Sequence, residues 1–228
     1  MHLNGLSPTC LPMSYSVKEM FATLQGEGAQ SGRAAIFCRF TGCNLWSGRE
    51  QDRAKAHCTF CDTDFIGLDG PGGGRFSTPE ALATALQACW QCATHDDESH
   101  QHRYVVFTGG EPLLQLDPPL IEAVKAHGFT IAVETNGTLP APTGIDWLCV
   151  SPKPGPELVQ TSGDELKLVY PQEALPPSLF EAMDFTHLWL QPLDNENRLR
   201  HTEQAVRYCQ THPQWRLSLQ THKLIGIP

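Results

Sequence analysis

The 228-residue chain lacks a stretch of about 18 consecutive apolar residues, which a membrane-spanning helix requires, so we expect no membrane partner. It also has few basic residues, because 16 Lys and Arg stand against 25 Asp and Glu, for a net charge of −9. That balance argues against a nucleic-acid partner, since phosphates would be repelled. The first residues lack the basic region and apolar run of a signal peptide, so we expect a cytoplasmic location.

The chain is also short for a complete eight-fold β/α barrel, which usually needs about 250 residues. A mostly disordered chain is excluded, because 40% of the residues are hydrophobic. What the sequence has in excess is cysteine. Nine cysteines are many for a chain without a secretion signal, and an odd number cannot all pair within the chain. A reducing compartment keeps thiols free, so these cysteines call for a metal or redox explanation.

Short apolar runs rich in β-branched and aromatic residues alternate with helical patterns along the chain. The predicted strands are Ala34–Phe40, Tyr104–Phe107, Thr130–Val133, Trp147–Val150, Leu166–Tyr170, His187–Leu190 and Trp215–Leu219. The predicted helices are Pro79–Gln91, Pro119–His127 and Asn197–Thr211. This alternation predicts an α/β fold with a parallel sheet and right-handed crossovers.

The same pattern predicts one domain over residues 14–228, preceded by an irregular tail over residues 1–13. Two stretches interrupt the alternation. A long loop over residues 43–77 is the first, and loops of that length inside a domain are usually functional or disordered. A polar, His-rich insertion over residues 92–103 is the second.

Three cysteines in the long loop are spaced Cys43-x14-Cys58-x2-Cys61. Three thiolates fit an iron–sulfur cluster that leaves one iron open to a small molecule. They also fit a zinc site completed by His57 or another residue. The third possibility is a set of buried thiols, although a loop directly after a strand is where reactive groups collect on β/α folds. Cys89 and Cys92, with His95, His100 and His102, imitate a second zinc motif.

Polar groups follow several predicted strands, where β/α folds bind their ligands. The segments are Thr108–Pro112, which contains a Gly-Gly pair, Glu134–Gly137, Ser151–Lys153 and Gln191–Asp194. Paired glycines let the backbone approach a ligand closely.

With these segments the chain resembles the radical S-adenosylmethionine superfamily and, within it, the 7-carboxy-7-deazaguanine synthase family. The resemblance covers nearly everything after Met13. Further matching pieces are Phe21–Gly28, Phe40–Leu45, Cys61–Thr63 and the tail Gln220–Pro228. Most of the superfamily has a shorter cysteine motif, C-x3-C-x2-C, whereas some members of the synthase family have the long spacing seen here.

The resemblance implies an incomplete, TIM-like β/α barrel of about six strands. It implies a lyase that converts 6-carboxy-5,6,7,8-tetrahydropterin to 7-carboxy-7-deazaguanine with loss of ammonia, in queuosine or 7-deazapurine biosynthesis. The implied cofactors are a 4Fe-4S cluster, S-adenosylmethionine and Mg²⁺. The radical chemistry belongs to the cofactor, so no catalytic side chain is assigned. Homodimerisation, a pterin substrate and an external flavodoxin- or ferredoxin-like electron donor are also implied.

The resemblance assigns site residues by motif. Cys43, Cys58 and Cys61 would bind the cluster, and Thr63 would bind Mg²⁺, which prefers oxygen ligands. The S-adenosylmethionine contacts would be Phe60, Cys61, Asp62, Gly110, Ser151, Pro152, Lys153, Gln191, Pro192, Leu193 and Asp194. The substrate contacts would be Leu24, Gln25, Gly26, Glu27, Arg39, Thr108, His222 and the carboxylate of Pro228. Arg39 would pair with the substrate carboxylate, which suits a planar bidentate donor.

Other interpretations stay open at this point. Arg39 could instead pair with Glu27, Thr63 could be a turn residue, and His222 could be structural. The chain could be another radical enzyme, such as a glycyl-radical activase, or a zinc or iron–sulfur protein without catalysis.

Overall fold

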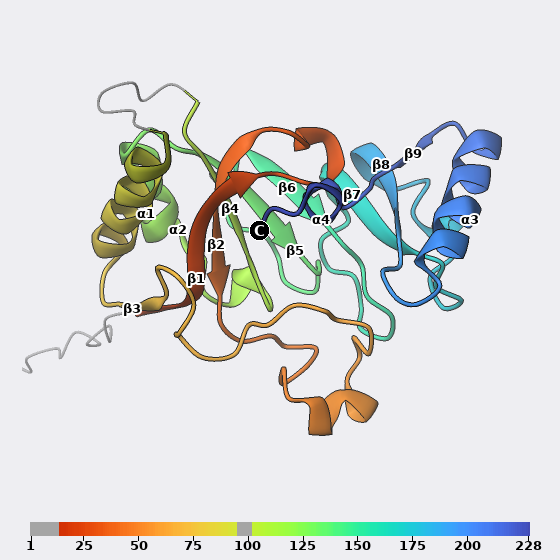
Figure 1. Cartoon of the computed structure of the whole chain (residues 1–228), viewed down its shortest axis with the longest axis horizontal. Helices are drawn as coiled ribbons and strands as arrows, with labels where there is room; N and C mark the ends of the chain where they lie inside the picture. The colour runs from red at the N-terminus through yellow and green to blue at the C-terminus, as the bar shows by residue number, and fades with distance from the viewer. Residues whose placement is uncertain (1–13, 95–101) are drawn as a thin grey trace, which may run out of the picture.

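A computed structural model describes residues 14–94 and 102–228, and its described residues form one sheet of nine strands (Figure 1). The strands lie in the order β3-β1-β2-β4-β5-β6-β7-β8-β9. Their bounds are β1 Tyr15–Leu24, β2 Ala34–Phe40, β3 Gly74–Phe76, β4 Tyr104–Gly109, β5 Thr130–Thr135, β6 Trp147–Val150, β7 Ser162–Tyr170, β8 Asp184–Pro192 and β9 Trp215–Leu217. Its first and last strands do not pair, so the sheet is open, as an incomplete barrel requires.

In the order of the sheet, each strand from β2 through β4 to β9 is parallel to its neighbour. All seven predicted strands lie in this parallel part. The two strands that the sequence did not predict, β1 and β3, are antiparallel to their neighbours. In β1 a register shift between Val17 and Glu19 breaks the regular alternation. β3 has only three residues, too few for a periodic signal.

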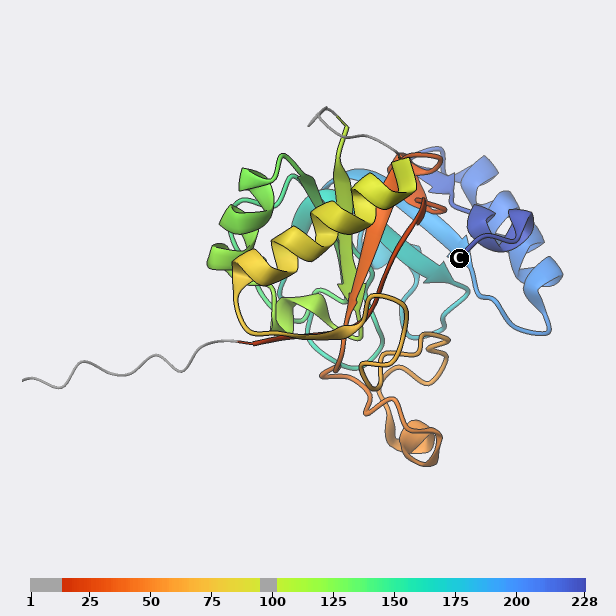
Figure 2. The ribbon, with the colours of Figure 1, turned by 60° about the vertical axis from the view of Figure 1, so that its left-hand side comes forward.

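Helices cover the sheet unevenly. They are α1 Pro79–Thr94, α2 Pro118–Ala126, α3 Arg198–Thr211 and α4 Thr221–Ile225, with 3-10 turns η1 Gly28–Gln30, η2 Glu50–Lys55, η3 Pro112–Leu114 and η4 Pro177–Leu179. Figures 1 and 2 show α1 and α2 together at one end of the sheet and α3 at the other. Helix α4 lies over the middle, close to the C-terminus (Figure 1).

Two parts of the predicted domain organisation lie outside the described residues. They are the tail over residues 1–13 and residues 95–101 of the polar insertion. The start of that insertion belongs to the last turn of α1, and its end leads into β4. The single domain over 14–228 stays a prediction. No helix in the described ranges is long and apolar enough to cross a membrane.

Strand residues alternate between two faces of the sheet. On β2, Ile36, Cys38 and Phe40 belong to the apolar core under α1 and α2, where β4 contributes Val105 and Phe107. A second apolar core packs α3 against β7, β8 and β9. The outer, helix-covered face of the sheet is therefore filled by apolar side chains.

The opposite, inner face is apolar at its floor and polar towards the carboxyl ends of the strands. Its floor contains Ala35, Tyr104, Val106 and Ala132. Further along the same face come Arg39, Thr108, Glu134, Lys167 and Gln191, from β2, β4, β5, β7 and β8. The parallel register thus gathers polar groups at one edge of the sheet.

Replacing Phe107 tests how far stability depends on the core under α1 and α2. Phe107 is fully buried and stacks on Phe40, with ring centroids 5.5 Å apart. Phe107→Ala should lower the free energy of unfolding by about 3–5 kcal/mol, because the cavity adds to the lost transfer energy. Leu199→Ala, at a residue that is 78% exposed, is the control and should change it by less than about 0.5 kcal/mol. Urea denaturation measures both, and equal midpoints would contradict this account of the core.

Candidate active site

A cavity of about 370 Å³ lies at the polar edge of the inner face. It is lined by the strand ends, by the long loop and by residues 220–228, called the C-terminal segment below. Nearly all the predicted site residues line it. They are Leu24, Gln25, Gly26, Glu27, Arg39, Cys58, Phe60, Cys61, Asp62, Thr63, Thr108, Gly110, Ser151, Lys153, Gln191, Pro192, Leu193, Asp194, His222 and Pro228. The exceptions are half-buried Cys43 and buried Pro152, which are not among the lining residues.

The three motif cysteines lie close to one another. A hydrogen bond between Cys58 and Cys61 lowers the pKa of the Cys61 thiol and raises that of Cys58. The thiol of Cys43 accepts the backbone N–H of Leu45 at 3.4 Å, although burial raises its pKa. All three thiols therefore gather where β2 opens into the long loop.

Three thiols are the donor set of an iron–sulfur cluster that leaves one iron open. Among the described residues, no three His, Cys, Asp or Glu side chains stand close enough to hold a single ion. Thiolates on different irons of a cluster are spread more widely than the ligands of one tetrahedral zinc. His57, the proposed fourth zinc ligand, instead lies against Gly155. The second zinc motif has Cys89 half-buried and Cys92 exposed on α1, while His95 and His100 lie outside the described residues.

Arg53 holds the turn that contains Cys58 and Cys61. Its guanidinium donates to the carbonyl oxygens of Thr59 and Cys61, each at 3.0 Å. Glu50 accepts from its Nε, and the guanidinium lies 4.2 Å from the ring centroid of Trp46. The long insertion between Cys43 and Cys58 thus supplies a brace for the turn from Cys58 to Cys61, which sequence reasoning missed.

The loop after β4 is fastened to its neighbours through a fully buried carboxylate. Glu111 accepts hydrogen bonds from Thr135 Oγ1 at 2.7 Å and from the backbone N–H groups of Asn136 and Leu113. Burial raises its pKa, and the three donors partly offset that. A Cβ on Gly110 would lie 2.1 Å from the carbonyl oxygen of Gly42, so only glycine allows this loop to pass the Cys43 segment.

Two carboxylates meet one lysine on the inner face. Lys167 forms ion pairs with Glu27 and, at 2.9 Å, with Glu134. The suggested pairing of Arg39 with Glu27 is therefore wrong. Arg39 pairs with Glu19 at 2.7 Å, because these two residues stand opposite each other in the β1–β2 register. Arg39 also lines the cavity, so its pairing leaves it within reach of a ligand.

The C-terminal segment crosses the mouth of the cavity. Thr221 donates to the carbonyl oxygen of Gly26 through both its N–H and its hydroxyl. A Cβ on Gly26 would come within 2.1 Å of His222, so the two segments are in close contact. Thr23 donates to the carbonyl oxygen of Pro228 at 2.7 Å.

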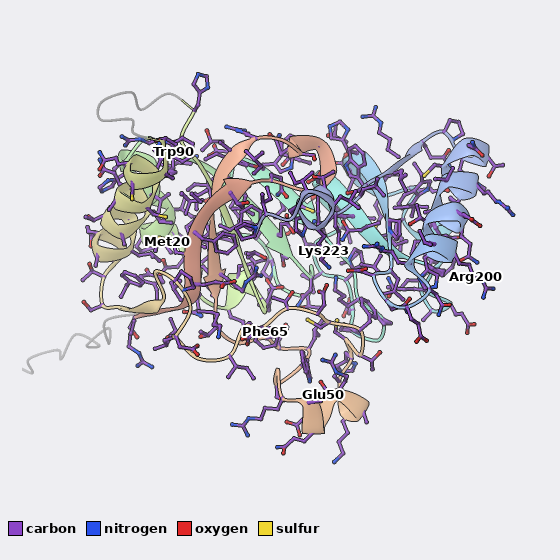
Figure 3. The ribbon with its side chains drawn as sticks, in the orientation of Figure 1. Met20, Glu50, Phe65, Trp90, Arg200 and Lys223 are labelled. Carbon is purple, nitrogen blue, oxygen red and sulfur yellow. The ribbon has the colours of Figure 1, made fainter. Side chains whose placement is uncertain are left out.

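Lys223 ties this segment to two other loops. Its Nζ donates to Asp62 at 2.8 Å and to Asp194 at 2.7 Å, and Figure 3 shows it in front of the middle of the sheet. Burial opposes its charge, but the two carboxylates outweigh burial and raise its pKa. Sequence reasoning missed Lys223, Lys167 and Glu134 as individual site residues; the matching tail and strand-end motifs were the signal for Lys223 and Glu134.

Partly buried Lys153 ends the strand-end segment 151–153. Its ammonium donates to both the carbonyl oxygen and the hydroxyl of Ser151, at 2.8 and 2.7 Å. Burial lowers its pKa, and the thiols of Cys58 and Cys61 act in the opposite direction. A cation therefore stands beside the motif cysteines.

Curated relatives resemble the chain over almost their whole length. The proteins named 7-carboxy-7-deazaguanine synthase from Bordetella pertussis and Caulobacter vibrioides are 64% and 62% identical over 216 residues, covering 95% of this chain and all of each relative. The chain belongs to the 7-carboxy-7-deazaguanine synthase family. The crystal structure of QueE from Escherichia coli, at 26% identity, matches with a TM-score of 0.63 over 91% of this chain and 94% of that one. No family model matches the chain.

These relatives confirm the family that the sequence motifs indicated, and the structural match confirms the partial-barrel fold. The synthase family is one of lyases, which agrees with the predicted enzyme class. The individual residue assignments stay predictions. What the structure adds is that nearly all of these residues line one cavity, and that Arg53, Lys167 and Lys223 link the segments around it.

If Arg53 braces the Cys58–Cys61 turn, Arg53→Met should make both thiols react faster with iodoacetamide in the cluster-free protein. We expect an increase of about tenfold, since charge-assisted hydrogen bonds of this kind contribute about 1.5–3 kcal/mol. Peptide mass spectrometry over time measures the two rates. Arg200→Met, at an exposed residue of α3, is the control, and equal rates in both variants would contradict the brace.

Proposed function

We propose that this cavity converts 6-carboxy-5,6,7,8-tetrahydropterin to 7-carboxy-7-deazaguanine with loss of ammonia, a step of queuosine or 7-deazapurine biosynthesis. One observation carries the proposal: Cys58 and Cys61 of the Cys43-x14-Cys58-x2-Cys61 motif line a cavity that the family's other motifs also line, and Cys43 lies near enough to both to interact with them. Family membership supports the same reaction.

Cys43, Cys58 and Cys61 would hold a 4Fe-4S cluster, and S-adenosylmethionine would bind beside it. When bound, these two groups supply the radical that starts the reaction. Lys153 stands next to Cys58 and Cys61 with one ammonium donor unused, which suits the carboxylate of the methionine part. Gly110 lets the backbone pass close by. The remaining proposed contacts are Phe60, Asp62, Ser151, Pro152 and Gln191–Asp194.

The substrate would bind to the β2 and β4 side of the same cavity. Arg39 and Thr108 are direct neighbours in the β2–β4 register, and both line the cavity. Glu19 leaves most of the guanidinium donors of Arg39 free for a substrate carboxylate. Leu24, Gln25, Gly26, Glu27, His222 and Pro228 would complete the pterin site.

We also propose that Thr63 is a Mg²⁺ ligand. Its hydroxyl oxygen is the kind of donor that this ion prefers, and it follows the cysteine motif at the cavity wall. The ion would orient the substrate and polarise its oxygens. A homodimer, a flavodoxin- or ferredoxin-like electron donor and a cytoplasmic location complete the proposal.

Anaerobic reconstitution with iron and sulfide tests the function. The loaded protein should absorb broadly in the visible range and, once reduced, should convert the carboxypterin to the deazaguanine product. Cys43→Ala is the matched variant and should not assemble the cluster. Formation of 5′-deoxyadenosine without deazaguanine would indicate another radical enzyme. If the protein shows no broad visible absorbance and forms no 5′-deoxyadenosine, it does not carry out radical catalysis.

Removing the hydroxyl of Thr63 tests the magnesium site. Thr63→Ala should raise the Mg²⁺ concentration needed for half-maximal turnover by about tenfold or more, since even supporting residues of metal sites are worth that much. Thr59→Ala is the control, because Thr59 is exposed and lies outside the cavity. Identical magnesium titrations for the two variants would remove Thr63 from the site.

Arg39→Lys tests the recognition of the substrate carboxylate. Lysine keeps the charge but loses the planar fork, so KM for the carboxypterin should rise about ten- to hundredfold. Arg200→Lys, at an exposed residue of α3, should leave KM unchanged. An unchanged KM in Arg39→Lys would mean that the guanidinium serves only its pair with Glu19.

A further inference from the structure

We propose that Lys167 is a positioning residue whose charge holds Glu27 and Glu134 together as an ionised pair at the cavity wall. Lys167, Glu27 and Glu134 are called the inner triad below. The proposal rests on the proposed function and deepens it, because Glu27 is one of the proposed substrate contacts.

The inner triad joins three segments that are far apart in the sequence. Glu27 follows β1, Glu134 lies near the end of β5, and Lys167 lies on β7. The side chain of Lys167 is only 5% exposed, against 12% for Glu27 and 21% for Glu134. The lysine is thus the most buried member of the inner triad, and all three side chains line the cavity.

Amide side chains fix the carboxylate oxygens that Lys167 does not hold. Gln25 donates to Glu134 Oε1 at 3.0 Å, while Gln191 and Gln220 donate to Glu27 Oε1 at 3.2 and 3.0 Å. Each carboxylate therefore has both oxygens engaged. These amides are neutral, so they set the orientation of the carboxylates and leave charge compensation to Lys167.

The charge of Lys167 decides which form these acids take. Burial alone would raise the pKa of Glu27, but the neighbouring ammonium outweighs burial and lowers it. The same pairing raises the pKa of Lys167 well above its usual range despite its burial. Without this cation two carboxylates would face each other, and the buried Glu27 would be the acid favoured to take a proton.

Other ionisable groups surround the inner triad and stay in place in every variant below. These groups are Tyr104 on the floor, Cys149 on β6, Glu165 on β7, and Lys153 and His222 at the cavity. Glu165 is itself engaged by the N–H groups of Ala29 and Trp147. A difference between variants at Lys167 and Glu27 therefore reports on the triad.

Thermal unfolding of the cluster-free protein across about pH 5 to 8 provides the first test. In the parent, the lowered pKa of Glu27 contributes stability that is present throughout this range and lost only at lower pH. In Lys167→Met, the pKa of Glu27 should lie above its unfolded value of about 4.3, so stability should fall as pH rises through the new value. A variant whose unfolding temperature follows the parent's pH profile would overturn the proposal.

Two matched variants separate charge from packing. Lys167→Arg should keep the parent's pH profile, because the cation remains. The double variant Glu27→Gln with Lys167→Met should lose the downward slope and unfold at a higher temperature than Lys167→Met near pH 8. If the double variant is no more stable than the single one, the defect is packing, and the proposal fails. The comparison stays informative if Lys167→Met does not fold, since the double variant should then recover a folded state.

The reconstituted enzyme supplies an independent readout. In Lys167→Met, KM for the carboxypterin should rise about tenfold or more at pH 8 and recover partly towards pH 6, with a smaller change in kcat. An unchanged KM profile would overturn the proposal. Failure of the proposed function is distinguishable, because the parent itself would then form no deazaguanine.

Discussion

The ion pairs of Lys167 connect the parts of the chain that must meet around the cavity. Glu27 leaves β1 at the antiparallel edge, Glu134 ends a central parallel strand, and Gln220 comes from the C-terminal segment, yet all three depend on one ammonium or on its partners. Because an unpaired buried carboxylate is costly, these segments cannot move apart independently. The position of the C-terminal segment over the cavity follows from this buried charge as much as from its own contacts.

The parallel half of the fold could be predicted because its strands are buried on both faces and flanked by turn residues. The antiparallel edge could not. In β1 the successive residues Val17 and Lys18 are both buried, at a register shift between Val17 and Glu19, so the strand does not alternate cleanly. The polar beginning of β7, Ser162–Glu165, was also left out of the predicted strand. In both cases tertiary pairing outweighs local hydrophobic periodicity.

The site residues that belong to motifs could be predicted from the sequence. The ion-pair and hydrogen-bond partners of these residues could not. Sequence spacing cannot show that Arg39 faces Glu19, because that depends on the β1–β2 register. Nor can it show that Lys223 reaches Asp62 and Asp194, which are at least 29 positions away. Arg53 lies in an insertion without periodicity, so only the folded loop reveals its contacts to Thr59 and Cys61.

Charge is distributed unevenly between the molecule and its cavity. The chain has nine more acidic than basic residues, yet the side chains that line the cavity include four cations and four carboxylates. Lys167 forms ion pairs with Glu27 and Glu134. Lys223 forms ion pairs with Asp62 and Asp194. Of the other two, Arg39 has one carboxylate partner, and Lys153 bonds only Ser151 among the described residues. An acidic protein thus keeps two cationic positions in its cavity for anionic groups of ligands.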